Sequence, residues 1–338
     1  MIISRTPFRI SFFGGGTDYP DWYRDNGGQV VGTTIDKYCY IALRRLPPFF
    51  THRHRFVYSR IEMVSQIHEI EHPAIRAVLQ EYPPAHGLEV HHDGDVPARS
   101  GIGSSSAFTV GLLNALRTLN GISLAAPELA AEAIRIEQTV AREAVGSQDQ
   151  VWAAHGGLNL VRFGAAGDID VEPLGLPPER LAALNDRLLL YFTGLTRTAS
   201  QIAAQQIGNI PRRGAELKEI MGQVDSAVAI LRDESCDLGD FGRLLHETWL
   251  VKRRLAEAIT TDFVDSLYDR ARAAGALGGK LLGAGGGGFM LLYVEPEHGE
   301  AVRRAMQGIL EIPIRINSPG STIVLNQPDG LGEAPART

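Results

Sequence analysis

One loop constrains this chain more than any other: a glycine- and serine-rich turn that runs directly into an apolar periodic segment. The turn spans residues 97–107, Pro-Ala-Arg-Ser-Gly-Ile-Gly-Ser-Ser-Ser-Ala, and the apolar segment continues to Leu119. This pattern predicts a loop that leads into a helix capped by its serines. A helix N-terminus offers free N–H groups and a positive dipole end, which suit a phosphate. An ordinary capped helix fits the same residues, so this loop alone does not decide the function.

Two further glycine-rich segments lie near the ends of the chain. Residues 6–19 read Thr-Pro-Phe-Arg-Ile-Ser-Phe-Phe-Gly-Gly-Gly-Thr-Asp-Tyr, and residues 280–289 read Lys-Leu-Leu-Gly-Ala-Gly-Gly-Gly-Gly-Phe. The second segment contains a formal dinucleotide fingerprint, Gly-x-Gly-x-x-Gly. That fingerprint requires a following helix, whereas residues 289–294 are typical of a buried strand. We therefore reject a Rossmann interpretation and expect a glycine loop that packs against the loop at 97–107. A purely structural tight turn is the alternative.

The three segments, in this order and at these separations, resemble the GHMP kinase superfamily, which includes galactokinase, homoserine kinase and mevalonate kinase. The resemblance covers roughly residues 1–325. Within the superfamily, residues 2–18 and 33–38 look most like the D-glycero-D-manno-heptose 7-phosphate kinases. The resemblance implies an α+β, two-domain GHMP kinase fold. Its N-terminal half would be like ribosomal protein S5 domain 2 and its C-terminal half ferredoxin-like, with ATP and sugar in the cleft between them.

The length of 338 residues allows two domains. A turn-rich zone over 164–178 places the expected boundary, giving domains 1–175 and 176–325 and a frayed tail, 326–338. The residue pattern predicts strands over 1–13, 29–46, 88–92, 187–193, 289–294 and 321–325. It predicts helices over 21–26, 104–119, 127–143, 198–208, 213–232, 240–258 and 262–274.

Composition excludes several classes of function. The formal charge of −6 gives no basic field for nucleic acid, and no apolar run has the length of a membrane span. Two distant cysteines, Cys39 and Cys236, match no metal-site spacing and indicate a reduced compartment. We therefore expect a cytoplasmic protein with small-molecule partners, no nucleic acid and no membrane partner. Whether the chain forms a homo-oligomer stays open.

Glu137 is an irregularity in the predicted helix 127–143, because it falls on the apolar stripe. A carboxylate on a buried face is costly unless it is paired or bound to a cation. A place at the edge of the stripe, reaching solvent, fits the residues equally well. The resemblance implies that Glu137 and Ser105 are Mg²⁺ ligands. A hydroxyl, a carboxylate and nucleotide phosphates form a normal environment for this ion.

Asp149 lies in the polar segment Gly-Ser-Gln-Asp-Gln at 146–150, which taken alone reads as a turn. The resemblance implies that it is the catalytic aspartate beside the accepting hydroxyl, either as general base or as an electrostatic positioner. Arg9 matches the basic residue of the first motif. It would orient Asp149 and offset charge on the transferred phosphoryl, although a surface cation beside a strand is the simpler reading.

Two sets of contacts follow from the resemblance. ATP is expected to contact the phosphate loop at Pro97, Arg99, Ser100, Gly101, Ile102, Gly103, Ser104, Ser105 and Ser106. The acceptor is expected to contact Gly14, Gly15, Gly16, Thr17, Asp18, Asp36, Lys37, Gly285, Gly286 and Gly287. Glycines let the backbone approach the sugar closely. Asp18 would accept from a sugar hydroxyl, or cap the following helix.

The resemblance implies a sugar kinase that uses ATP and Mg²⁺. It would phosphorylate the anomeric hydroxyl of heptose 7-phosphate to give heptose 1,7-bisphosphate, for GDP-heptose and surface polysaccharide synthesis. Basic side chains would hold the substrate phosphate, with candidates at Lys37, Arg44, Arg45, Arg53, Arg55, Arg60, Arg99 and Arg197. Two alternatives stay open: a kinase for fucose or a uronic acid, and a non-catalytic sugar- or nucleotide-binding regulator. The joint presence of Ser105, Glu137 and Asp149 argues against the second.

Overall fold

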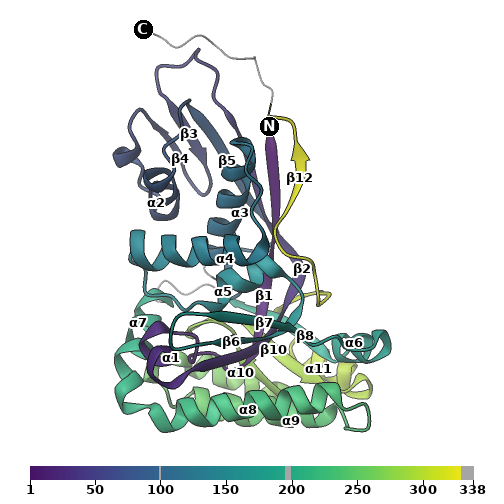
Figure 1. The fold of residues 1–338 in the computed structure, drawn as a ribbon. Helices are drawn as coiled ribbons and strands as arrows, with labels where there is room; N and C mark the ends of the chain where they lie inside the picture. The colour runs from purple at the N-terminus through teal and green to yellow at the C-terminus, as the bar shows by residue number, and fades with distance from the viewer. Residues whose placement is uncertain (99, 195–198, 329–338) are drawn as a thin grey trace.

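The structure, a computed structural model, describes residues 1–98, 100–194 and 199–328. Two β-sheets and the helices around them form a mixed α/β fold (Figure 1). The larger sheet has the strand order β12-β1-β2-β5-β3-β4, and β6 and β7 extend it from β2. Its strands are β1 (Ile2–Phe13), β2 (Gly28–Arg45), β3 (His54–Val57), β4 (Ile61–Val64), β5 (Leu88–Gly94), β6 (Leu158–Phe163), β7 (Ile169–Pro173) and β12 (Thr322–Asn326).

The long strand β2 organises the larger sheet. One edge pairs with β1 along most of its length, whereas the other edge pairs twice, with β6 over Gly28–Thr33 and with β5 over Cys39–Arg45. The sheet therefore divides into two arms, and β1 crosses both of them. The first glycine segment begins where β1 ends, at Phe13.

Helices α3 (Ser104–Leu119), α4 (Ala126–Arg135) and α5 (Gln148–His155) form a layer on the larger sheet (Figure 1). α3 packs against β1 and β2, and most of its residues are buried, because it lies between the sheet and the neighbouring helices. Two further helices, α1 (Pro20–Asn26) and α2 (Pro73–Glu81), begin with proline, which suits a first helical turn.

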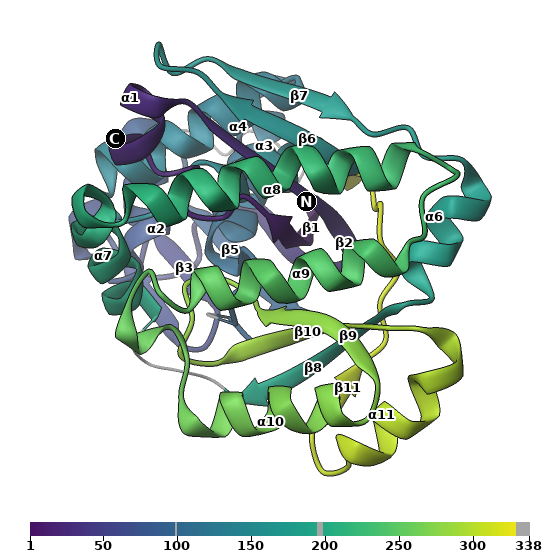
Figure 2. The ribbon, with the colours of Figure 1, turned by 90° about the horizontal axis from the view of Figure 1, so that it is seen from below.

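The smaller sheet is antiparallel, with the order β11-β8-β10-β9. Its strands are β8 (Leu188–Gly194), β9 (Ala276–Leu281), β10 (Gly288–Val294) and β11 (Leu310–Ile312). The helices of this half are α6 (Pro178–Asn185), α7 (Ala199–Asn209), α8 (Gly214–Arg232), α9 (Gly239–Lys252), α10 (Asp262–Ala273) and α11 (Gly299–Ala305). Figure 2 shows α8 and α9 running side by side; α8 also packs on β1 and β2, and α9 packs on β9.

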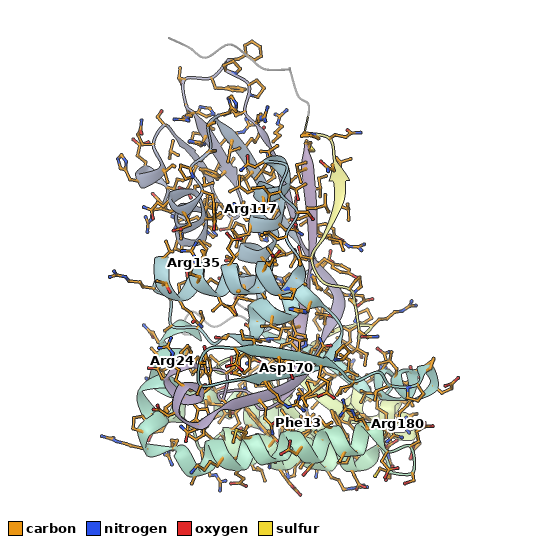
Figure 3. The ribbon with its side chains drawn as sticks, viewed as in Figure 1. Phe13, Arg24, Arg117, Arg135, Asp170 and Arg180 are labelled. Atoms are coloured by element: carbon orange, nitrogen blue, oxygen red, sulfur yellow. The ribbon has the colours of Figure 1, made fainter. Side chains whose placement is uncertain are left out.

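An aromatic cluster joins the two halves beneath the end of β1. Phe12 and Phe13 each pack edge-on against Phe241 of α9, with ring centroids 5.3 Å and 5.0 Å apart. Figure 3 marks Phe13 among the side chains of this region. Edge-to-face pairs are favourable beyond the area they bury, so this cluster holds the glycine segment after β1 close to α9.

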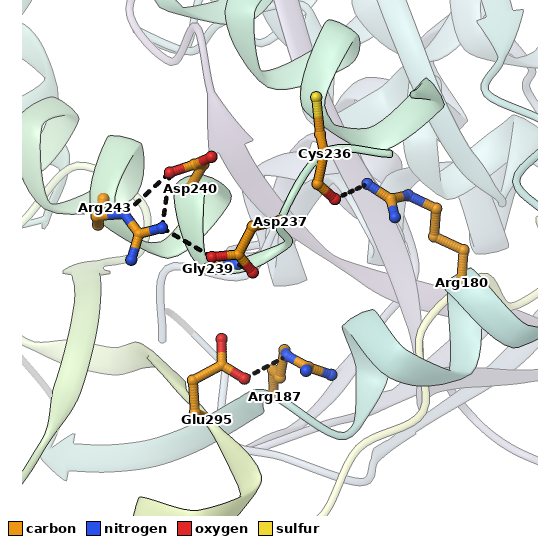
Figure 4. A network of polar contacts seen from close by, with 8 residues as sticks. All are labelled: Arg180, Arg187, Cys236, Asp237, Gly239, Asp240, Arg243 and Glu295. Atoms are coloured by element: carbon orange, nitrogen blue, oxygen red, sulfur yellow. Dashed lines mark hydrogen bonds and ion pairs between the residues drawn. The ribbon is translucent and has the colours of Figure 1, made fainter. Parts of the chain in front are cut away.

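Polar contacts fix the turn between α8 and α9 (Figure 4). Asp237 accepts hydrogen bonds from Gly239 N at 2.9 Å and from the Arg243 guanidinium at 2.9 Å. Arg180 of α6 donates to the carbonyl of Cys236 at 3.1 Å. Below the turn, Arg187 pairs with Glu295 at 2.8 Å. These contacts hold the N-terminal end of α9, whose last residue enters the site described below.

Most predicted elements are present, with two corrections. The predicted helix 127–143 is α4 followed by a π-helical turn, Ile136–Val140, where Ala141 N donates to Ile136 O at 2.8 Å. A positive φ of 56° at Arg142 then ends the helical path. The predicted helix 240–258 ends as α9 at Lys252, and the chain reaches a 3₁₀ turn at Glu257–Ile259. Several short elements, including β3, β4, β6, β7, β9 and α5, have no counterpart among the predictions.

The domain boundary at residue 175 stays a prediction. The strand β12, which lies late in the chain, pairs with β1 of the first half. Part of the predicted tail, residues 329–338, lies outside the described residues. None of the helices in the described part of the chain combines the length and apolar character needed to cross a bilayer.

Candidate active site

Arg9 and Asp149 form the centre of the site. Arg9 projects from β1, and Asp149 lies in the first turn of α5, so two elements far apart in sequence position the pair. Arg9 Nε donates to Asp149 Oδ1 at 2.8 Å, and Arg9 Nη2 donates to Oδ2 at 2.8 Å. The Asp149 side chain is 25% exposed and the Arg9 side chain only 6%. This two-pronged geometry fixes the carboxylate while leaving part of it accessible.

The phosphate loop touches this pair directly. Arg9 Nη1 donates to Gly101 O at 2.7 Å, and Arg9 N donates to Ile102 O at 3.0 Å. A Cβ on Gly103 would lie 3.2 Å from Arg9 Cγ and 3.4 Å from Asp149 Oδ2. The N-terminus of α3 and the Arg9–Asp149 pair therefore lie next to each other.

The expectation that serines cap α3 is wrong. The N-cap residue is Gly103, in a left-handed conformation with φ of 75°, and it has no side chain to cap the helix. Ser100 instead closes the preceding turn, because its hydroxyl donates to Pro97 O at 2.7 Å. Ser105 is exposed in the first turn of the helix, where a ligand can reach it.

The third glycine segment interlocks with the phosphate loop. A Cβ on Gly283 would lie 2.5 Å from Gly101 Cα, and a Cβ on Gly288 would lie 2.3 Å from Ser100 O. Both residues have positive φ, at 69° and 106°. Side chains therefore have no room at this contact, and the backbones meet directly. Within the same segment, Gly286 N donates to Ile259 O at 2.9 Å.

Glu137 is a buried carboxylate on the π-helical turn beside α3. Its Oε2 accepts from Ser106 Oγ at 2.8 Å and also from Gln150 Nε2. Its Oε1 has no hydrogen-bond partner within the described ranges. Burial raises the pKa of Glu137 to about 7, although the hydrogen bonds to its carboxylate oppose that shift. The side chain thus lies on the buried face, and it contacts Ser106 rather than Ser105.

Asp18 lies beside Asp149 in the loop after β1, and it is 2% exposed. Its Oδ1 accepts from Gly16 N at 3.0 Å. Burial raises the pKa of Asp18, and the neighbouring charge of Asp149 adds to the increase. Asp18 is not the helix cap, because the N-cap of α1 is Tyr19. The loop itself is tied down by Thr17, whose hydroxyl contacts the carbonyls of Gly14 at 2.8 Å and Gln29 at 2.9 Å.

Asp36 and Lys37 are engaged with each other rather than with the Arg9–Asp149 pair. Lys37 Nζ donates to Asp36 Oδ1 at 3.0 Å, and the same oxygen accepts from Arg315 N at 2.8 Å. These contacts join β2 to the segment before β12. Contact of Asp36 and Lys37 with the acceptor sugar stays a prediction.

The arginines expected to hold a substrate phosphate lie mostly at the other end of the sheet. Arg44 and Arg55 both pair with the buried Glu89. Arg53 donates to the carbonyls of Pro84 and Ala85, and Arg60 pairs with Glu71. β3, which carries Arg55, and β5, which carries Glu89, lie far from α5 in Figure 1. Those four side chains have partners within the chain, and their expected role in holding a substrate phosphate stays a prediction. Arg99 and Arg197 lie outside the described residues.

Two site residues have no counterpart among the predictions: Lys252 at the end of α9 and Lys280 on β9. Their side chains reach the two outer glycine segments, and both residues are buried, at 7% and 3% exposed. Lys280 carries a recognisable signal, since it interrupts an apolar strand directly before the third glycine segment. Lys252 lies in the charged run Lys-Arg-Arg, and the sequence gives no signal that it is buried.

Comparisons with known proteins agree with this geometry. The family model of the GHMP kinases N terminal domain matches residues 67–157, and that of the GHMP kinases C terminal domain matches residues 227–311. The chain belongs to the GHMP kinase superfamily, and it is an ATP-dependent kinase of that class.

Two curated relatives and one solved structure are similar to most of this chain. The D-glycero-alpha-D-manno-heptose 7-phosphate kinase of Campylobacter jejuni is 28% identical over 87% of this chain and 90% of its own length. The bifunctional fucokinase/GDP-fucose pyrophosphorylase of Arabidopsis thaliana is 23% identical over 92% of this chain, which spans 31% of that protein. The structure of a D-glycero-D-manno-heptose 1-phosphate kinase from Bacteroides thetaiotaomicron superposes with a TM-score of 0.74. It is 25% identical and covers 95% of this chain and 98% of its own.

Proposed function

We propose that this protein is a cytoplasmic sugar kinase that transfers the γ-phosphoryl group of ATP to the anomeric hydroxyl of heptose 7-phosphate. The product would be heptose 1,7-bisphosphate, a precursor for GDP-heptose and surface polysaccharide. The observation that carries the kinase proposal is the Arg9–Asp149 pair, which abuts the phosphate loop at Gly101 and Gly103. The heptose assignment is supported by the two heptose kinases, each of which is similar to this chain over most of the length of both proteins.

Asp149 would bind the hydroxyl group of the sugar that accepts the phosphoryl group. Its carboxylate is held by Arg9 and partly exposed, so it can accept a hydrogen bond from the hydroxyl and orient it toward the phosphate. Arg9 keeps the carboxylate in place and adds positive charge where charge accumulates on the transferred group. Phosphoryl transfer depends mainly on such alignment and charge neutralisation, so a weak base suffices. Asp18, Gly14, Gly15 and Gly16 would surround the sugar.

The residues beside the phosphate loop fit a magnesium ion. Within the described ranges no three His, Cys, Asp or Glu side chains cluster as a metal site, but Mg²⁺ needs few protein ligands when phosphates supply the rest. The unpaired, buried Glu137 Oε1 and the exposed Ser105 hydroxyl would be those ligands. Bound Mg²⁺ would neutralise charge on the phosphates. Ser106, which donates to Glu137, would orient the carboxylate.

Arg213 lies near the loop after β1, beside a cavity of about 10 Å³ that is too small to hold the substrate itself. Gly16, Tyr19 and Leu217 line it, and so does Arg213, whose side chain is 43% exposed. Arg213 pairs with Glu216 at 2.9 Å, so a substrate phosphate would compete with that carboxylate. We infer that Arg213 is better placed than the arginines of residues 44–60 to contact a phosphate on a bound sugar.

A fucose kinase is the second candidate function. It is favoured by the fucokinase relative and by the engagement of Arg44, Arg53, Arg55 and Arg60 with partners in the chain, because an unphosphorylated sugar needs no such cation.

The test is ATP consumption by the full chain with heptose 7-phosphate, free heptose, fucose and galactose, with phosphorus NMR of each product. We expect a preference for heptose 7-phosphate of at least about a hundredfold in kcat/KM, about 2.7 kcal/mol. Arg213→Gln should reduce that preference, while Arg212→Gln, at an exposed neighbouring position, should not. Preference for a free sugar would overturn the heptose assignment, and no turnover with any sugar would favour a regulatory protein.

A further inference from the structure

Two buried lysines lie beneath the three glycine segments, and the proposed chemistry leaves them unused. An ammonium group loses most of its hydration when it is buried, so such a residue needs acceptors or opposite charge nearby. Lys252 and Lys280 reach this region from different elements, the end of α9 and the strand β9.

Lys252 holds the third glycine segment at its start. Its Nζ donates to Leu281 O at 2.9 Å and to Gly283 O at 2.7 Å. Gly283 in turn packs against Gly101, the residue whose carbonyl accepts from Arg9. A continuous set of contacts therefore runs from Lys252 through both loops to the Arg9–Asp149 pair.

Lys280 holds the first glycine segment. Its Nζ donates to Phe12 O at 2.8 Å, immediately before the turn at Gly14. An ammonium carries three N–H groups, so this one carbonyl does not exhaust its donors. The two lysines together tie both outer glycine segments to the same small volume of the structure.

Charged groups near Lys252 and Lys280, together with burial, shift the pKa values of both amines. Arg9 on β1 is the nearby cation that acts on both lysine amines, and the nearby acidic groups are Asp18 in the loop after β1 and, through Arg9, Asp149 on α5. Burial lowers the pKa of Lys252 to about 7, and Arg9 adds to that decrease while Asp18 opposes it. Burial, Lys252 and Arg9 lower the pKa of Lys280 well below its usual range. Further negative charge would favour the charged form of both lysines.

We propose that Lys252 and Lys280 are positioning residues that hold the glycine segments around the transferred phosphoryl group and take up protons when a nucleotide binds. The proposal rests on the proposed function only in taking a nucleotide as the anionic ligand; it does not depend on the identity of the sugar. Since nucleotide binding raises the proton affinity of the lysines, affinity should fall as pH rises above 7.

The test is calorimetric binding of the magnesium complex of AMP-PNP to the full chain at pH 8, in two buffers of different ionisation enthalpy. We expect net proton uptake by the wild type, and a Kd that weakens at least about threefold between pH 7 and pH 9. Lys252→Met should lose at least half of the uptake and flatten this pH dependence. Lys218→Met, at an exposed position on α8, should behave as wild type.

The wild-type measurement alone can overturn the proposal: nucleotide binding without proton uptake, with a Kd that is constant over this pH range, contradicts it. If Lys252→Met does not fold, Lys280→Met answers the same question, and a melting curve for each variant reports folding. The readout needs no acceptor sugar, so a wrong substrate assignment leaves it intact.

Discussion

Arg9 and Asp149 lie 140 residues apart in the chain, yet they meet through two parallel hydrogen bonds of 2.8 Å each. The third guanidinium nitrogen of Arg9 is committed to the phosphate loop, through Gly101 O. One side chain thus links the carboxylate expected to orient the acceptor with the loop expected to hold the donor. A small displacement of Arg9 would disturb both partners at once.

The first prediction concerns Asp149→Asn. The amide keeps the size of the carboxylate but removes its charge and places an N–H group against the Arg9 guanidinium. We expect kcat to fall by about a hundredfold or more, the range typical of lost acid–base assistance, with nucleotide affinity unchanged. Steady-state kinetics and nucleotide binding measure the two quantities.

The matched control for this variant is Asp21→Asn, which changes an exposed carboxylate on α1. It should retain wild-type kcat. Near-wild-type turnover by Asp149→Asn would remove this residue from the mechanism.

The second prediction concerns Glu137→Gln. The variant keeps an acceptor for Ser106 but loses the negative charge expected to face Mg²⁺. The Mg²⁺ concentration for half-maximal activity should rise by about tenfold or more, the range found when metal-site contacts are removed. ATP binding should weaken with it.

Glu132→Gln, five residues earlier on α4, is the control and should leave the Mg²⁺ requirement unchanged, because Glu132 binds Tyr82 instead. Equal effects of both substitutions would indicate a general disturbance of the helix rather than a metal site.

The third prediction concerns His54 on β3, which is 1% exposed. Its Nδ1 accepts from Leu88 N at 3.2 Å, so the ring must be neutral at that nitrogen. Burial, with a smaller contribution from Arg53, lowers the pKa of His54 to about 4. The unfolded chain therefore binds the extra proton first as pH falls from 6.5 toward 4. The free energy of unfolding should decrease across this window by up to about 1.4 kcal/mol per pH unit.

Urea unfolding at pH 7 and pH 4.5 measures this loss. His54→Asn keeps an acceptor near the Nδ1 position without a titrating ring, so its stability should fall less over the same interval. Equal losses in both proteins would show that other groups cause the acid sensitivity.

The parts of the site that lie in continuous motifs could be predicted from sequence. Glycine segments and the helix after 104 are local patterns, and the Arg9–Asp149 contact follows once the family resemblance aligns the two segments. The apolar stripe offered a buried position for Glu137 as one of two alternatives, and the structure shows that the side chain is buried. The inferences about the glycine segments, the helix and Glu137 use spacing between neighbouring residues, whereas the Arg9–Asp149 contact rests on the resemblance.

The other contacts of the candidate site depend on packing between residues far apart in the chain, which the local sequence pattern does not encode. The hydroxyl that donates to Glu137 belongs to Ser106, and Glu137 lies on a π-helical turn that no periodicity of the sequence predicts. Lys252 becomes buried only because α9 ends beneath Leu281 and Gly283. The pairing of Arg44 and Arg55 with Glu89 likewise requires three strands to come together, and a count of arginines does not reveal it.

The last prediction concerns the contact between the third glycine segment and the phosphate loop. Ala at position 283 would place its Cβ 2.5 Å from Gly101 Cα, in a residue with φ of 69°. The left-handed conformation alone costs a non-glycine residue roughly 1–2 kcal/mol. Gly175→Ala is a control for that cost, because Gly175 has φ of 61° and a Cβ there would have no neighbour within 4 Å. Both variants should therefore melt at lower temperature, but only Gly283→Ala should push the phosphate loop away from Arg9 and raise the KM for ATP, by at least about tenfold. Equal KM values for the two variants would show that the interlocked glycines serve stability and not nucleotide binding.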